Sequence, residues 1–181
     1  MPKPIFIQDR YAKIAEMVRV NYAGEYGACR IYKGQINFIS NKTCKAQIIS
    51  MLEHEEEHCA FFAQQIQNRK IRPTCFMPLW HAFGYISGAI TAITGPKFAM
   101  LYTEAVENAI DQHYQDQIRQ LELIFAEREK KLTIAIKRFH QEEIEHKIIA
   151  KTYYNELSKI GIVFKNLVES ICNIAICLSK K

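Results

Sequence analysis

Hydrophobic side chains recur at steps of three and four residues along most of the chain, which is the spacing that places them on one face of an α-helix. Gly and Pro, which interrupt helices, are absent from residues 35–72 and from residues 97–160. This pattern predicts four long amphipathic helices, at residues 9–40, 43–71, 97–126 and 127–159. The join between the last two carries neither Gly nor Pro, so the sequence defines it least well.

Turn chemistry and two further apolar segments complete the predicted layout. Residues 41–43 (Asn-Lys-Thr) are expected to supply a turn and an N-cap for the second helix, and Gly161 is expected to stop the fourth. Residues 79–93 and 162–178 are predicted as shorter, apolar helices. The predicted fold class is therefore all-α, a four-helix bundle with additional apolar helices in one domain of residues 1–181.

The longest run without a charged residue, residues 73–96, suggests contact with a membrane. Its mostly apolar part, residues 79–93, is shorter than the ~20 residues that span a bilayer. We expect an apolar insert that dips into one leaflet, and the alternative is an ordinary buried helix. Gly84 and Gly88 would allow either close helix contact or dimerisation.

Composition narrows the function classes. The chain has 24 Lys and Arg against 19 Asp and Glu, a net charge of +5, with no zinc-finger spacing or aromatic-rich basic run, so we expect no nucleic-acid partner. Its six cysteines form no CxxC pair and are expected to be free thiols in a reducing compartment. The first ten residues lack a signal peptide or transit pattern, so the mature chain is expected to start near Met1.

Each of the four long helices carries a glutamate in the middle of its apolar stripe: Glu25, Glu55, Glu107 and Glu143. The predicted stripe of the second helix is Ile48, Leu52, Glu55, Cys59, Phe62 and Ile66, with His58 adjoining it, and that of the fourth is Leu132, Ile136, Phe139, Glu143, His146, Ala150, Tyr153 and Leu157. A buried ionised carboxylate costs several kcal/mol unless it is paired or binds a cation. One such residue is compatible with an ordinary core hydrogen bond. Four of them, one on each helix, indicate a metal site.

Two of these glutamates are followed three residues later by a histidine, His58 and His146. Side chains three residues apart project from the same side of a helix and can bind one ion. Two lone glutamates plus two Glu-x-x-His pairs form the ligand set of di-iron and di-manganese four-helix bundles. Four carboxylates balance the charge of two divalent ions, and the ligand types suit iron and manganese alike.

A competing motif overlaps the first pair. Residues 54–58 read His-Glu-Glu-Glu-His, which matches the zinc-protease motif H-E-x-x-H with His54 and His58 as ligands and Glu55 as the base. His54, however, lies about 100° around the helix from Glu55 and off the apolar stripe. The corresponding segment of the fourth helix keeps Glu-x-x-His but has no His-x-x-x-His, so the two-metal interpretation is favoured.

Three segments resemble the demethoxyubiquinone hydroxylases, ferritin-like di-iron monooxygenases of ubiquinone biosynthesis. Residues 19–28 (RVNYAGEYGA) are similar to the family signature RVDHAGEYGA, and residues 103–107 with the following His113-Tyr114, together with residues 142–146, resemble its third and fourth helix motifs. The resemblance covers residues 11–160. It implies a ferritin-like fold and the same six ligands, Glu25, Glu55, His58, Glu107, Glu143 and His146.

Two positions of the signature differ from the family. Asn21 and Tyr22 stand where the family usually has Asp and His. Neither is a family ligand. Asn21 keeps the shape of aspartate without its charge, so the support that this position gives to neighbouring ligands is open.

The resemblance also implies a reaction. The chain would hydroxylate the ring of a polyprenyl benzoquinol, demethoxyubiquinol, with O₂ at two iron ions, and NADH or the quinol itself would re-reduce them. No Rossmann fingerprint is present. His113 and Tyr114 are candidates for delivering electrons or protons to the site, and the alternative for both is packing on a helix face.

The expected location follows from the substrate. We expect a peripheral enzyme on the cytoplasmic face of a bacterial inner membrane, or on the matrix side of the inner membrane if the protein is mitochondrial. A homo-oligomer and partner proteins of ubiquinone biosynthesis are further expectations. Two other functions stay open: a ferritin-like iron-binding protein, which the apolar insert disfavours, and a non-catalytic helical bundle that binds lipid.

Overall fold

The computed structural model describes residues 7–181, and within that range the chain is helical and has no β-strand. The six α-helices described are α1 (Ile7–Phe38), α2 (Lys42–Asn68), α3 (Met77–Ile93), α4 (Pro96–Gln120), α5 (Lys130–Lys151) and α6 (Lys159–Ser179). The all-α prediction is confirmed. The expected start of the mature chain near Met1 lies outside the described residues.

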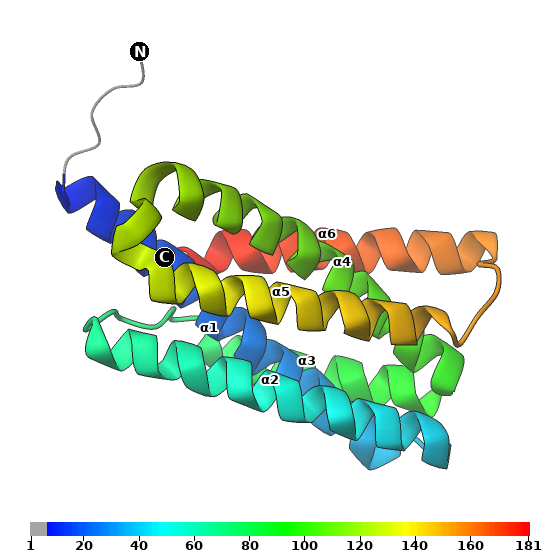
Figure 1. The fold of residues 1–181 in the computed structure, drawn as a ribbon. Coiled ribbons are helices and arrows are strands. Elements are labelled where there is room, and N and C mark those ends of the chain that lie inside the picture. The colour runs from blue at the N-terminus through cyan, green and yellow to red at the C-terminus, as the bar shows by residue number, and fades with distance from the viewer. Residues whose placement is uncertain (1–6) are drawn as a thin grey trace.

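Two antiparallel helix pairs, α1 with α2 and α4 with α5, form the bundle, and α3 and α6 are added on its outside (Figure 1). The short helix α3 lies between the two pairs in the sequence and packs along α1, and α6 packs along α4. Helix α6 is held there by Lys165, whose Nζ donates to buried Glu104 Oε1 at 2.7 Å, and by Asn108, whose Nδ2 donates to Glu169 at 2.9 Å.

The predicted stripes are the buried faces. In α5 every buried residue belongs to the predicted stripe: Leu132, Ile136, Phe139, Glu143, His146 and Ala150. In α2 the buried face is turned slightly from the prediction, because Met51 and His58 are buried whereas Leu52 and Cys59 are only half-buried. That rotation brings His58 from the margin of the stripe to its centre.

Backbone-to-backbone contact joins α1 and α3. A Cβ atom added at Gly88 would overlap the carbonyl group of Ile31, and one added at Gly34 would overlap the carbonyl oxygen of Tyr85. Close helix contact, one of the two uses expected for Gly84 and Gly88, is therefore what this structure shows. Because α1 covers that face, the two glycines do not offer it for dimerisation.

Replacing Gly88 with alanine is expected to lower the free energy of unfolding by about 3 kcal/mol or more, because overpacking against backbone costs about 1–3 kcal/mol even where side chains can adjust. The matched control is Gly27→Ala, since nothing lies within 4 Å of a Cβ atom there. That substitution is expected to be neutral or to stabilise by up to about 1 kcal/mol, through helix propensity. Equal urea midpoints for the two variants would contradict the close-contact argument.

The turn predictions had mixed outcomes. Asn41 caps α2 as expected, its side chain accepting from the Cys44 backbone N–H at 2.9 Å. The prediction that the fourth helix reaches residue 159 and stops at Gly161 was wrong, because α5 ends at Lys151 and Gly161 lies in the first turn of α6. Ser158 caps α6 by accepting from the Gly161 N–H at 3.2 Å, so the serine starts a new helix.

The uncertain join between the third and fourth long helices is made without a loop. A π-helical turn (Leu121–Phe125) and a 3₁₀ turn (Ala126–Glu129) carry the chain from α4 into α5. Arg69, which follows α2, donates to both carboxylate oxygens of Glu129 at 3.0 and 2.7 Å. The bidentate pair therefore ties the end of α2 to this irregular turn.

Candidate metal centre

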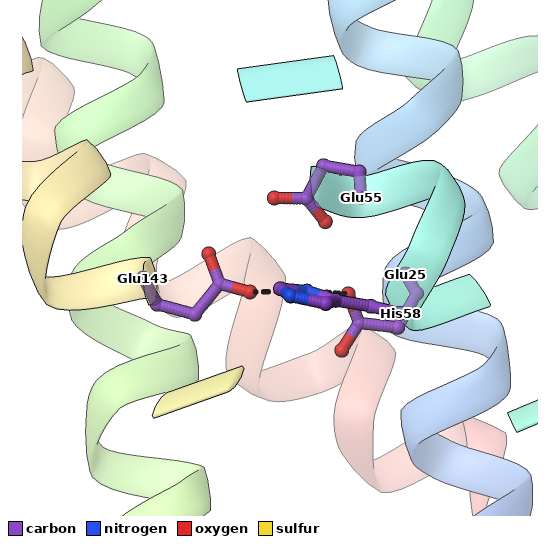
Figure 2. A group of neighbouring side chains, drawn as sticks. All are labelled: Glu25, Glu55, His58 and Glu143. Carbon is purple, nitrogen blue, oxygen red and sulfur yellow. Dashed lines mark ion pairs between the residues drawn. The ribbon is translucent and has the colours of Figure 1, made fainter. Parts of the chain in front are cut away.

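The four stripe glutamates meet inside the bundle. Each exposes at most 4% of its surface, although each comes from a different helix. Figure 2 shows Glu143 from α5 pointing across the bundle at His58 and Glu55 from α2 and at Glu25 from α1. Apolar clusters lie on both sides along the bundle axis, one containing Phe62, Ile136 and Phe139 and the other containing Ile48, Met100 and Ala150. The centre is consequently a polar layer within an apolar core.

The side chains form two overlapping groups of possible ligands. The first comprises Glu25, Glu55, His58 and Glu143, and the second comprises Glu55, Glu107, Glu143 and His146. Within each group the ligand atoms lie within 4.8 Å of one another. Glu55 and Glu143 belong to both groups. All six residues predicted from the sequence are thus brought together, in the arrangement expected for two ions bridged by two carboxylates.

Two buried atoms of the cluster make no hydrogen bond. They are Oε1 of Glu55 and Nδ1 of His58. The His58 nitrogen lies 3.1 Å from Glu143 Oε1 and 3.4 Å from Glu25 Oε2, but these contacts lack hydrogen-bond angles. Buried polar atoms are costly without a partner. A divalent cation supplies that partner, and carboxylate and imidazole are suitable ligands, so the residues fit a two-metal site.

The pKa values of the cluster reflect crowded carboxylates without a cation. Burial, and next the charge of Glu143, raise the pKa of Glu55 and Glu107 well above the usual range. Burial works against the imidazolium of His58, but the close carboxylates of Glu143 and Glu25 raise its pKa to about 12. Burial likewise opposes ionisation of Glu143, whose pKa is nevertheless held low by a hydrogen bond from His146 and by the nearby imidazolium of His58. In the absence of metal the cluster therefore retains protons at neutral pH.

Metal affinity is expected to rise with pH between about 6 and 8. His58, Glu55 and Glu107 hold protons in the metal-free site, and these must leave when the atoms become ligands, so low pH opposes binding. Each proton released makes the affinity for Fe²⁺ about tenfold higher per pH unit. Anaerobic calorimetry in buffers of different ionisation enthalpy measures the number released. An affinity for Fe²⁺ that did not change with pH would show that metal binding does not release these protons.

Two buried tyrosines hold the lone glutamates. Tyr114 of α4 donates its hydroxyl to Glu25 Oε1 on α1, and Tyr32 of α1 donates to Glu107 Oε1 on α4 at 2.7 Å. Tyr114 was predicted as a site residue, and the structure brings it into direct contact with a predicted ligand. Tyr32 was not predicted. Its signal in the sequence was its place on the stripe seven residues after Glu25, the same interval that separates Glu107 from Tyr114.

His113, the other predicted site residue, lies beside the cluster and contacts none of the six ligands through a described hydrogen bond. Its Nε2 is 3.2 Å from Asn21 Oδ1 and 2.8 Å from Gln117 Nε2. Burial, and next the charge of Lys180, lower its pKa to about 4, so the ring is neutral at pH 7. Asn21 also exchanges hydrogen bonds with the Gln117 amide at 2.8 Å. The uncharged Asn21 is thus part of a neutral buried network.

The zinc-protease arrangement does not form. His54 belongs to neither ligand group, and its Nδ1 lies 3.1 Å from Nε2 of His146, on the side of that ring away from the carboxylates. Glu142 occupies the corresponding place behind His58, with Oε2 2.6 Å from His58 Nε2. Neither of these outer contacts was predicted from the sequence.

An apolar cavity of about 110 Å³ lies next to the centre. Its walls come from α1, α3, α4 and α6. They include Gly24 and Val106, which directly precede Glu25 and Glu107 in the sequence, but none of the six candidate ligands. At the far side Trp80 of α3 donates its indole N–H to Ser179 of α6 at 3.1 Å. The cavity thus has the apolar lining expected of a site for a hydrophobic molecule.

Comparisons with known proteins agree with one another. The family model described as ubiquinone biosynthesis protein COQ7 matches residues 12–179. The NADPH-dependent 3-demethoxyubiquinone 3-hydroxylase, mitochondrial, of Homo sapiens is 38% identical over 170 residues, 94% of this chain and 78% of the relative. The 3-demethoxyubiquinol 3-hydroxylase of Rhodospirillum rubrum is 35% identical over 181 residues, which cover 99% of this chain and 81% of the relative. The 5-demethoxyubiquinone hydroxylase, mitochondrial, of Saccharomyces cerevisiae is 32% identical over 189 aligned positions, which cover 97% of this chain and 81% of the relative.

Proposed function

The chain belongs to the family of ubiquinone biosynthesis protein COQ7, and from this premise we propose that it hydroxylates the benzoquinol ring of a demethoxyubiquinol with O₂ at a di-iron centre. The protein is a ferritin-like hydroxylase of ubiquinone biosynthesis. The observation that carries the di-iron assignment is the pair of overlapping ligand groups that share Glu55 and Glu143. When bound, two Fe²⁺ ions supply electrons that reduce O₂, so that one oxygen atom enters the ring and the other leaves as water.

The ligands divide into shared and terminal ones. Glu55 and Glu143, which belong to both groups, would be shared by the two ions. Glu25 with His58 would complete one metal position, and Glu107 with His146 the other. The hydroxyl groups of two tyrosines fix the orientation of the terminal glutamates, which keeps their remaining oxygen atoms directed at the metal positions.

The apolar cavity is the proposed site for the quinol ring and the first part of its tail. Val106 and Ile110 of α4 face Val168 and Ile171 of α6 across it, so the lining excludes water. A ring lying beside Gly24 would be next to the metal ligand Glu25. Glycine at that position leaves space between α1 and Ile110, the nearest side chain at 3.9 Å from an added Cβ atom.

Helices α3 and α6 are the proposed membrane contact, because both line the cavity and both expose large apolar side chains. On α3 these are Leu79, Phe83, Ile86, Ile90 and Ile93, and on α6 they are Ile160, Ile162, Val163, Leu167 and Ile174. Among the described helices, only α6 is long and apolar enough to cross a bilayer by length and composition. We assign it instead to one leaflet beside α3, since Lys165 and Glu169 fasten it to α4.

The membrane contact is tested by flotation with liposomes that contain anionic lipid, which attracts the excess of Lys and Arg. The protein should float, alkaline carbonate should release it, and Ile90→Glu with Ile174→Glu should reduce flotation. The control is Ile148→Glu on α5, which is similarly exposed but lies on neither helix. Protein that stays soluble with liposomes would contradict the proposal, and resistance to carbonate would indicate that α6 spans the bilayer.

The reaction is tested with iron-loaded protein, a short-chain demethoxyubiquinol and O₂. Reduced nicotinamide nucleotide is the first reductant to supply, because several relatives are named NADPH-dependent, and the quinol alone is the second. Ring hydroxylation with about one O₂ consumed per product is the expected result. Protein that binds two iron ions and the quinol but forms no product with either reductant would favour a non-catalytic lipid-binding bundle.

A further inference from the structure

The surroundings of the metal centre repeat between the two halves of the chain. On α1, Tyr32 follows Glu25 by seven residues, and on α4, Tyr114 follows Glu107 by seven residues. Each tyrosine donates its hydroxyl to the glutamate of the other helix. The terminal glutamates of the two metal positions are therefore supported in the same way.

The two ligand histidines are oriented alike but are supported by different partners. On α2, His54 precedes the ligand Glu55 and contacts Nε2 of His146 on α5. On α5, Glu142 precedes the ligand Glu143 and contacts Nε2 of His58 on α2. Nε2 of His58 donates to the carboxylate of Glu142 at 2.6 Å, whereas Nε2 of His146 lies 3.1 Å from Nδ1 of His54. A carboxylate thus supports one histidine, and a second imidazole supports the other.

The hydrogen positions follow from the side of each ring that faces the carboxylates. Nδ1 of His58 and Nδ1 of His146 each lie 3.1 Å from an oxygen of Glu143, so Nδ1 is the metal-binding atom in both rings. With Nδ1 bound to metal, Nε2 would carry the ring hydrogen and be the donor. His54 would then accept that hydrogen through Nδ1, and the planes of the His54 and His146 rings differ by 11°.

A carboxylate and an imidazole do not have the same effect on the ring that donates to them. A carboxylate acceptor makes the donating imidazole more electron-rich and a stronger metal ligand, and loss of such a partner typically costs 10–100-fold in metal affinity. Glu142 keeps this capacity because Arg138 approaches only its other oxygen, at 3.9 Å. His54 fixes the orientation of the His146 ring but adds no charge.

We infer that the two metal positions are unequal: the position completed by Glu25 and His58 binds metal more tightly than the position completed by Glu107 and His146. Glu142 and His54 are the positioning residues that cause the difference. The inference rests on the two-metal centre proposed above.

Anaerobic titration of metal-free protein with Fe²⁺ is the test. The wild type should show two steps whose affinities differ at least tenfold, and protein given one equivalent of ⁵⁷Fe²⁺ should show mainly one Mössbauer quadrupole doublet. Glu142→Gln, which keeps an acceptor oxygen but removes the charge, should weaken the tighter step about 10–100-fold. His54→Glu, which places a carboxylate behind both histidines, should strengthen the weaker step.

The matched control is Glu145→Gln, which removes the same charge from an exposed position between the two α5 ligands and should leave both steps unchanged. Circular dichroism of each variant separates a folding defect from a metal effect. Two equal steps in the wild type, or equal effects of Glu142→Gln and Glu145→Gln, would overturn the inference alone. A wild-type chain that bound no Fe²⁺ would instead contradict the proposed di-iron function.

Discussion

Replacing Glu143 with alanine is expected to empty both metal positions and to abolish hydroxylation of a demethoxyubiquinol. Glu143 belongs to both ligand groups, and its two oxygens lie 3.1 Å from Nδ1 of His58 and from Nδ1 of His146. Loss of a residue that merely supports a ligand costs about 10–100-fold in metal affinity, so loss of a ligand shared by two ions should exceed about a hundredfold. Bound iron per chain and quinol turnover measure the effect.

Glu143→Gln keeps the shape of the side chain and should also lose most of the iron, which separates the loss of a ligand charge from a cavity in the core. Glu145→Gln, two residues further along α5 and exposed, should retain wild-type iron content. Near-stoichiometric iron in Glu143→Ala would show that the carboxylate does not bridge the metals.

Replacing Val168 with tryptophan is expected to reduce turnover of the long-chain quinol by about one to two orders of magnitude while both metals stay bound. Val168 is buried on α6, lines the apolar cavity and lies away from the six ligands. An indole ring would fill space that the substrate ring and tail are proposed to occupy, and misplacement of a substrate by about 1 Å can cost about 10²-fold in rate.

Ile174→Trp is the control for Val168→Trp, because Ile174 lies on the same helix but is exposed and does not line the cavity. Iron content and the Mössbauer spectrum should be the same in both variants and the wild type. Unchanged turnover in Val168→Trp would mean that the quinol approaches the centre by another route.

The period of the apolar positions predicted the helices well, because each stripe continues for many turns and one error changes little. It failed where the chain turns without Gly or Pro. Residues 152–158 contain no helix breaker, yet the chain leaves the helix at Thr152, and Ser158 begins another by bonding the Gly161 N–H. The absence of a breaker therefore does not establish that a helix continues.

The candidate ligands were found from the sequence because a carboxylate in an apolar stripe is conspicuous wherever it occurs. The residues behind the ligands were missed for the opposite reason. Glu142 and His54 lie at the polar margins of their helices, where such residue types are ordinary, and their partners are about 90 residues away in the chain. Only the packing of α2 against α5 shows which histidine each one supports.

Each ligand group takes residues from both helix hairpins. The first group has three residues from the α1–α2 hairpin and one from α5. The second group has one residue from α2 and three from the α4–α5 hairpin. Helices α2 and α5 carry ligands on opposite sides of the centre (Figure 2). Metal held in the proposed centre would therefore act as a removable cross-link between two halves of the protein. Its loss should let the hairpins separate before either one unfolds, and metal bound far above its dissociation constant should add several kcal/mol against that opening.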